Sequence, residues 1–439
     1  MTTTREPAER LDDPHPTGRA VRLLLRRIHF LAGLLIAPFL AVLAVTGILY
    51  AFTPQINDVL YGDRLYVDQV GAAPRPVDEQ VQAALGAHPD AAFKSVVVSA
   101  DPERTTEVVL AAPGLDEHGG DHFSAESLTV YVNPYTAAVQ GDLVTVNGRP
   151  PAQVWLRELH GNLNLGEPGR LYAEFVASWL PVVVIGGIVL WVGTRRARSR
   201  TGRARLRGLH ASVGLWAAVG LLVLSATGLT WSKYAGERVD QLIEAVDAKS
   251  PSLRSADVEP TAARISLDRA VVIARDSGLE GDLTVTAPTA SARPLKINES
   301  SLGLPVQKDS VAVDPYTGAV TGRVSWDDYP LLAKLTSVGI AAHSGTLFGL
   351  ANQLLLALVA GAALVLLVLG YRMWWLRRPR AGGAAAAPDA VWRRMTWPLR
   401  IAVLVVAAAT AWAMPVFGGS LVLFLVADLA LAARRRKTA

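Results

Sequence analysis

Four long stretches without Asp, Glu, Lys or Arg limit what this chain can fold into more than any other feature. They cover residues 30–57, 175–194, 211–232 and 335–371. A helix that crosses a bilayer core needs about 20 apolar residues, so each stretch can supply one transmembrane helix. Because the last stretch is longer than one span, we expect its helix to begin near Thr346, after a membrane-surface segment. A hydrophobic content of 51% agrees with a polytopic α-helical membrane protein.

Arginines set the expected orientation of these helices. They crowd the segments before the first span, between the second and third, and after the fourth: Arg19, Arg22, Arg26, Arg27; Arg195, Arg196, Arg198, Arg200, Arg203, Arg205, Arg207; Arg372, Arg377, Arg378 and Arg380. The positive-inside rule places all three segments, and hence the N-terminus, in the cytoplasm. The first span lacks small-residue cleavage signals, which predicts a retained signal anchor. The two long polar segments, roughly 53–165 and 233–340, are then expected outside the cytoplasm.

A further apolar run near the C-terminus could form one span or a short hairpin. It is broken at Met414-Pro415 and Gly418-Gly419, and the basic tail "ARRRKTA" favours two short helices that return to the cytoplasm. We expect transmembrane helices at 28–52, 171–194, 208–232 and 346–371, and a transmembrane hairpin at 397–434. Extracytoplasmic domains are expected at 53–170 and 233–345. The cytoplasmic segments are then 1–27, 195–207 and 372–396, with a cytoplasmic tail at 435–439.

Both long polar segments have the pattern of small α+β domains. Residues 78–87 and 266–277 have the periodicity of amphipathic helices. Alternating runs such as "KSVVVSA", "TEVVLAA", "LTVYVNP", "DLTVTAP" and "SVAVDPY" predict strands. The phrases "NPYTAAVQG" and "DPYTGAVTG" place Asn-Pro or Asp-Pro and a glycine between two strands, which is typical of a tight hairpin.

The sequence repeats itself. "RRIHFLAG" (26–33) aligns with "RGLHASVG" (207–214), and a Thr-Gly pair follows each histidine at 17 and 18 residues. Further on, "LHGNLNLGEPGRL" (159–171) aligns with "AHSGTLFGLANQL" (342–354). The chain is therefore two copies of one unit, helix–domain–helix, plus a C-terminal addition. In membrane proteins built from repeats, functional sites tend to lie where the repeats meet.

Four of the eight histidines form two symmetry-related pairs on this repeat. His29 and His210 begin the outward-going helices, and His160 and His343 precede the inward-going ones, so each membrane surface receives one pair. Gly33 and Gly214 follow their histidines at i+4, on the same helical face and one turn deeper. A planar macrocycle held by the histidine would need that space, although such glycines also serve close helix packing. Their recurrence together with histidine favours the ligand interpretation.

These motifs resemble the PepSY-associated transmembrane proteins, the iron-regulated membrane proteins that include inner-membrane ferric-siderophore reductases. The resemblance covers about residues 20–380. It rests on the R-x-x-H helix start with a later T-G, the [ND]-P-Y-T-[AG]-x-V turns, "LHGNL…GEPGRL" and "HSGTLFGL". It implies extracytoplasmic PepSY-like domains, haem bound by transmembrane histidines and electron delivery to ferric chelates. Carried over to this chain, the axial haem ligands would be His29, His210, His160 and His343.

Sidedness pairs His29 with His210 and His160 with His343, which implies two haem b groups per chain. Two imidazoles on one iron make a saturated, low-spin site suited to electron transfer. Electrons would enter near the first pair and leave near the second, across the cytoplasmic membrane of a bacterium. The chain has no cysteine, which excludes iron–sulfur clusters and c-type haem, and it has no nucleotide-binding fingerprint. A cytoplasmic or quinol donor is therefore needed, and a ferric chelate is the expected acceptor; nucleic acid is not an expected partner.

Three other interpretations remain. The loop "DEHGGDH", with His118 and His122, could bind a metal ion, but glycine-containing loops between strands are usually solvated hairpin tips. A transporter generally needs ionisable residues within its spans, and the four main spans have almost none besides the boundary histidines. A non-redox role, in which PepSY-like domains bind or regulate envelope peptidases or other partners, suits the duplicated domains but leaves the four histidines without a function. Proteolysis by this chain is not expected, because it has no H-E-x-x-H or hydrolase nucleophile motif.

Overall fold

The computed structural model describes residues 16–115, 125–192, 202–261, 263–300, 308–376, 392 and 395–437. The chain divides into two compact units. The helical unit contains Met1–Val45, Glu167–Asp240 and Leu358–Ala439. The sheet unit contains Thr46–Gly166 and Gln241–Ala357. Each unit thus combines segments from both sequence repeats.

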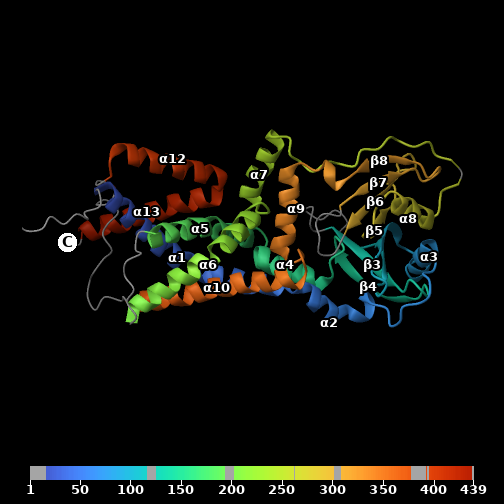
Figure 1. Ribbon diagram of the computed structural model, residues 1–439, viewed down its shortest axis with the longest axis horizontal. Coiled ribbons are helices and arrows are strands. Elements are labelled where there is room, and N and C mark those ends of the chain that lie inside the picture. The colour runs from blue at the N-terminus through green and yellow to red at the C-terminus, as the bar shows by residue number, and fades with distance from the viewer. Residues whose placement is uncertain are drawn as a thin grey trace, which may run out of the picture. The chain divides into compact units, whose positions relative to one another are not determined.

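Four helices are long and apolar enough to cross a membrane: α1 (Pro16–Ala51), α5 (Glu167–Val192), α6 (Gly202–Leu229) and α10 (Leu350–Trp375). Their apolar parts coincide with the four charge-free stretches of the sequence. In the helical unit they lie side by side (Figure 1). The chain is therefore a multi-pass α-helical membrane protein, as the sequence predicted.

The apolar C-terminal segment forms two shorter helices, α12 (Trp397–Ala413) and α13 (Pro415–Lys437), which pack against each other. The break falls at Met414, because Pro415 has no backbone N–H and cannot continue the hydrogen bonding of the preceding helix. Trp179 of α5 packs on Phe417 of α13 and donates its indole N–H to the Ser420 hydroxyl at 2.8 Å. These contacts attach the C-terminal addition to the repeated helices.

Small and aliphatic side chains join three of the four long helices. Leu180 of α5, Ala217 and Leu221 of α6, and Ala363 of α10 form one buried cluster. Small residues allow helices to approach closely, which is how helices associate in a lipid environment. One buried charge, Glu174 of α5, accepts hydrogen bonds from two backbone N–H groups at the start of α7 (Lys233–Ala245). The carboxylate thus satisfies donors that a helix N-terminus leaves without intrahelical partners.

Within the described residues, the eight strands of the sheet unit form one antiparallel sheet in the order β4-β3-β2-β1-β5-β6-β7-β8. The strands are β1 (Ala92–Val98), β2 (Thr106–Ala111), β3 (Glu126–Val132), β4 (Val139–Val146), β5 (Asp282–Thr286), β6 (Leu295–Ser300), β7 (Ser310–Val313) and β8 (Val320–Val324). Each repeat contributes four of them, as expected for two α+β segments. The two segments join through β1 and β5, where Val96 pairs with Val285.

Helices α3 (Val77–Ala87) and α8 (Leu267–Asp276) cover one face of this sheet (Figure 1). Both were expected from their amphipathic pattern. Their N-termini exchange hydrogen bonds: Asp268 accepts from the Val77 N–H at 2.9 Å, and Asp78 accepts from the Leu267 N–H at 2.9 Å. Because equivalent residues make equivalent contacts, the sheet unit is itself organised as two matching halves.

The remaining helices of the sheet unit are α2 (Thr53–Leu65), α4 (Pro151–Asn162) and α9 (Leu331–Ser344), with a short 3₁₀ turn at Trp326–Asp328. Helix α4 ends two residues after His160, and α9 ends one residue after His343. Leu163 ends α4 and Gly345 ends α9 in the left-handed conformation, which is a common way to stop a helix. These endings fix the positions of His160 and His343.

Candidate functional site

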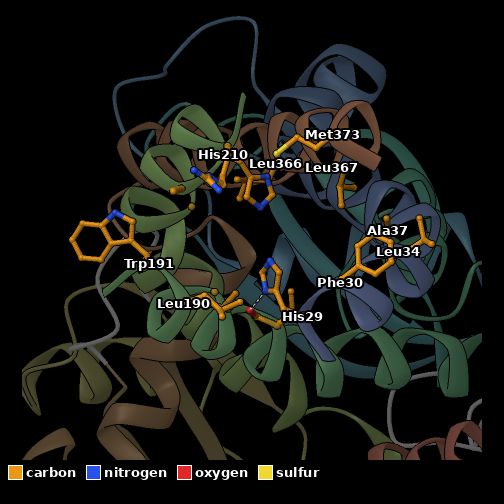
Figure 2. Close-up of a pocket in the computed structure, with 18 of the residues that line it drawn as sticks. His29, Phe30, Leu34, Ala37, Leu190, Trp191, His210, Leu366, Leu367 and Met373 are labelled. Atoms are coloured by element: carbon orange, nitrogen blue, oxygen red, sulfur yellow. Dashed lines mark hydrogen bonds between the residues drawn. The ribbon is translucent and has the colours of Figure 1, made fainter. Parts of the chain in front are cut away.

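His29 and His210 face each other inside the helical unit. His29 is on α1 and His210 is on α6, and their ring centroids are 6.2 Å apart with the ring planes at 85°. Figure 2 shows the two rings pointing toward each other from opposite walls of a pocket. The repeat relates these two residues, and the fold brings them together.

Each of these histidines meets equivalent groups on the neighbouring helix. The His29 Nδ1–H donates to the Val183 backbone carbonyl at 2.8 Å, and the Leu366 carbonyl lies toward His210. The His210 Nδ1 is buried without a hydrogen bond of normal geometry. Val183 and Leu366 are 183 positions apart, as are His160 and His343. A metal-binding histidine typically donates its second N–H to such a carbonyl, which leaves Nε2 free as the ligand atom.

Two glycines give the histidine rings their space. A Cβ at Gly187 of α5 would lie 3.0 Å from His29 Cε1, and a Cβ at Gly370 of α10 would lie 3.9 Å from His210 Cε1. The two glycines are again 183 positions apart. At Gly187 a side chain would press directly on the imidazole, so this glycine permits the observed position of His29.

A cavity of about 760 Å³ opens between the two rings. This volume lies in the range of small-molecule and cofactor sites. Gly33 and Gly214 line the cavity, one turn from their histidines. A Cβ at Gly33 would meet nothing within 4 Å, and one at Gly214 would lie 3.6 Å from Leu366. Gly33 therefore borders open space, whereas Gly214 is also in ordinary packing distance of α10.

His160 and His343 form a second pair inside the sheet unit. His160 is in the last turn of α4 and His343 in the last turn of α9, and their ring centroids are 6.4 Å apart. Thr46 Oγ1 and His160 Nδ1 share a hydrogen bond of 3.0 Å. Tyr50 lies parallel to the His160 ring at a centroid distance of 6.5 Å. The end of α1 thus orients His160.

Glycines also shape this second pair. A Cβ at Gly47 would lie 3.0 Å from His160 Cε1, and a Cβ at Gly345 would lie 3.0 Å from the Ala51 backbone oxygen. Burial, with a smaller contribution from His160, lowers the pKa of His343 to about 4. The His343 imidazole is therefore neutral at pH 7, which is the form that binds a metal ion.

Both separations fit two imidazoles on one metal ion. Two metal–nitrogen bonds of about 2.0 Å, plus roughly 1 Å from each nitrogen to its ring centre, place the centroids about 6 Å apart. Among the described residues no group of three or more His, Cys, Asp or Glu side chains could hold a metal ion. Haem brings four nitrogens of its own and needs only two axial ligands, which is the number that a histidine pair supplies.

Other histidines lie apart from these pairs. His88 follows α3 and its Nε2 is 3.2 Å from an Asp142 carboxylate oxygen. His118 and His122, the two histidines of the predicted metal loop, lie outside the described residues.

A family model described as PepSY-associated TM region matches residues 26–377, which include all four paired histidines. The chain belongs to the PepSY-associated TM region family. No curated protein matches it.

Sequence reasoning predicted the two histidine pairs that the structure brings together, but it missed the groups beside them. Val183, Gly187, Leu366 and Gly370 have no histidine near them in the sequence. The repeat could have revealed them, because the two inward-going helices are offset by 183 residues. With that offset Val183 corresponds to Leu366, and Gly187 corresponds to Gly370. Thr46 was recognised as part of a repeated Thr-Gly pair, and its contact with His160 gives that pair a structural role.

Proposed function

We propose that this protein transfers electrons across the bacterial cytoplasmic membrane through two haem b groups and reduces ferric chelates, such as ferric siderophores, on the extracytoplasmic side. It would serve iron acquisition as a ferric reductase. The observation that carries the proposal is the recurrence of one geometry. Two histidine pairs, at centroid distances of 6.2 and 6.4 Å, each combine one histidine from each repeat.

The chain's own residues would hold and orient the cofactors. His29 with His210, and His160 with His343, would supply axial Nε2 atoms. The Val183 carbonyl and the Thr46 hydroxyl would fix two of the rings through Nδ1, which also raises ligand basicity. Bis-imidazole haem supplies one-electron chemistry between ferric and ferrous iron, without an open position for oxygen.

The two pairs suit the two sides of a membrane. His29 and Thr46 are 17 residues apart on the same helix, so α1 contributes to both pairs at different depths. The positive-inside rule assigns the His29 end to the cytoplasm and the sheet unit to the extracytoplasmic side. A cytoplasmic protein or a quinol would donate electrons near the first pair. The sheet unit would hold the acceptor near the second.

The deciding experiment is a dithionite-reduced minus oxidised visible spectrum of the detergent-purified chain, with haem quantified per chain. We expect a sharp low-spin b-type α-band and two haems. His29→Ala and His343→Ala should each remove about one haem. His88→Ala is the matched control, because His88 lies outside both pairs and should leave the spectrum unchanged.

A chain that stays colourless after haem supplementation would refute this function. The alternative would then lead: a non-redox membrane protein whose PepSY-like sheet unit binds or regulates envelope peptidases or other partners. A band that survives in all three variants would also contradict the ligand assignment.

A further inference from the structure

The cavity between His29 and His210 has two chemically different ends. Its deeper part is lined by aliphatic side chains such as Leu40, Leu180 and Leu221. Its other end is lined by Arg22, Arg26 and Arg207. Among the described residues, every side chain along its wall that carries a permanent charge is an arginine. A ligand that fills this cavity must therefore have an apolar body and an anionic edge.

The arginines occupy fixed positions relative to the histidines. Arg26 precedes His29 by three residues, and Arg207 precedes His210 by three residues. On an α-helix this spacing places each arginine on the face of its histidine, about 4.5 Å toward the N-terminus. Arg22 lies seven residues before His29, one turn further along the same face. Orientation by the positive-inside rule needs basic residues in the segment, but it does not need them on this face.

We propose that Arg26 and Arg207, assisted by Arg22, bind the carboxylates of the porphyrin that His29 and His210 hold. This inference rests on the proposed function. A haem b porphyrin is an apolar disc with two propionate carboxylates on one edge. A guanidinium group matches a carboxylate through two parallel hydrogen bonds, which gives both strength and orientation. The propionates then point to the arginine end, and the vinyl-bearing edge lies among the aliphatic side chains.

The chain offers matched control residues. Arg27 adjoins Arg26, and Arg205 lies two residues from Arg207, but neither lines the cavity. The double variant Arg27→Gln/Arg205→Gln removes the same charge from the same two segments as Arg26→Gln/Arg207→Gln. Any effect of net charge or membrane orientation is therefore shared by both double variants, and only contact with the cavity distinguishes them.

The test compares two porphyrins in a His343→Ala background, so that only the first site is loaded. Full-length apoprotein in detergent receives either haem b or its dimethyl ester, which lacks the two negative charges. The readout is the rate at which excess apomyoglobin removes the porphyrin. We expect haem b to leave the Arg26→Gln/Arg207→Gln variant at least tenfold faster than it leaves the parent, which is the His343→Ala chain with all its arginines intact. The control variant should stay within twofold. The ester should leave all three proteins at one fast rate, with low-spin spectra throughout.

Equal loss of haem b from the two double variants would overturn the proposal. So would a variant that loses haem b and the ester faster by the same factor, since the arginines would then act through the fold or through a lipid headgroup. His160→Ala replaces His343→Ala if the latter does not accumulate. A separate outcome is that neither porphyrin gives a low-spin spectrum, in the parent or in the unmutated chain. It refutes the proposed function itself, and this assignment with it.

Discussion

Glu107 is a half-buried carboxyl group near the middle of the sheet. It lies on β2 beside Val97 of β1 and Tyr131 of β3. Burial raises the pKa of Glu107 to about 7; the positive charge of Arg104 opposes this shift and the negative charge of Asp282 adds to it. Near neutral pH the folded protein therefore holds a proton here that the unfolded chain would release.

The contribution of Glu107 to stability is fully present below the unfolded pKa of 4.5, and it is lost as pH rises through about 7. Glu107→Gln, which mimics the protonated form, should therefore stabilise the protein at pH 8, by at most about 3 kcal/mol, and change little at pH 5. Thermal unfolding of the detergent-purified chain at both pH values measures this. The exposed Glu103→Gln is the control, and an equal gain at both pH values would contradict the assignment.

At the scale of whole elements, local patterns predicted the helices well but not their partners. The amphipathic periodicity around Asp78 and Ser266 predicted α3 and α8, and the charge-free stretches predicted the spans. The pairing of β1 with β5 could not be predicted, because alternation marks a strand without naming its neighbour. Gly187 likewise lies 158 residues from His29, so no local periodicity connects the two.

Gly187 should be essential for the contact between α5 and α1. A side chain there would begin 3.0 Å from His29 Cε1, closer than ordinary packing allows. Gly187→Val should displace the imidazole and remove about one of the two proposed haems, the same loss that we expect for His29→Ala. In Gly361→Val, on α10, the added Cβ meets nothing within 4 Å, so haem content should be unchanged. Haem quantification on matched amounts of purified protein measures both, and full haem content in Gly187→Val would show that His29 is not held as described.

For the whole molecule, the duplication matters because neither repeat contains a complete pair. His29 and His160 belong to the first repeat, and His210 and His343 belong to the second. The repeats are joined by packing of α5 on α6 and by the β1–β5 pairing. The repeat and the sidedness of the helices predicted both the corresponding histidines and their pairing across the repeats, and the folded chain brings the two pairs together.

Cutting the chain between the repeats should therefore leave each half without a complete histidine pair. We expect a first half ending near residue 200 and a second half beginning there to give no low-spin haem spectrum when expressed singly, because each supplies one histidine per pair. Co-expressed halves should assemble through the α5–α6 and β1–β5 contacts and regain about two haems. A full-length chain cleaved after purification at a protease site introduced at the same position controls for the cut and should keep its haem. A single half that forms a low-spin site by itself would show that the ligands are not shared between the repeats.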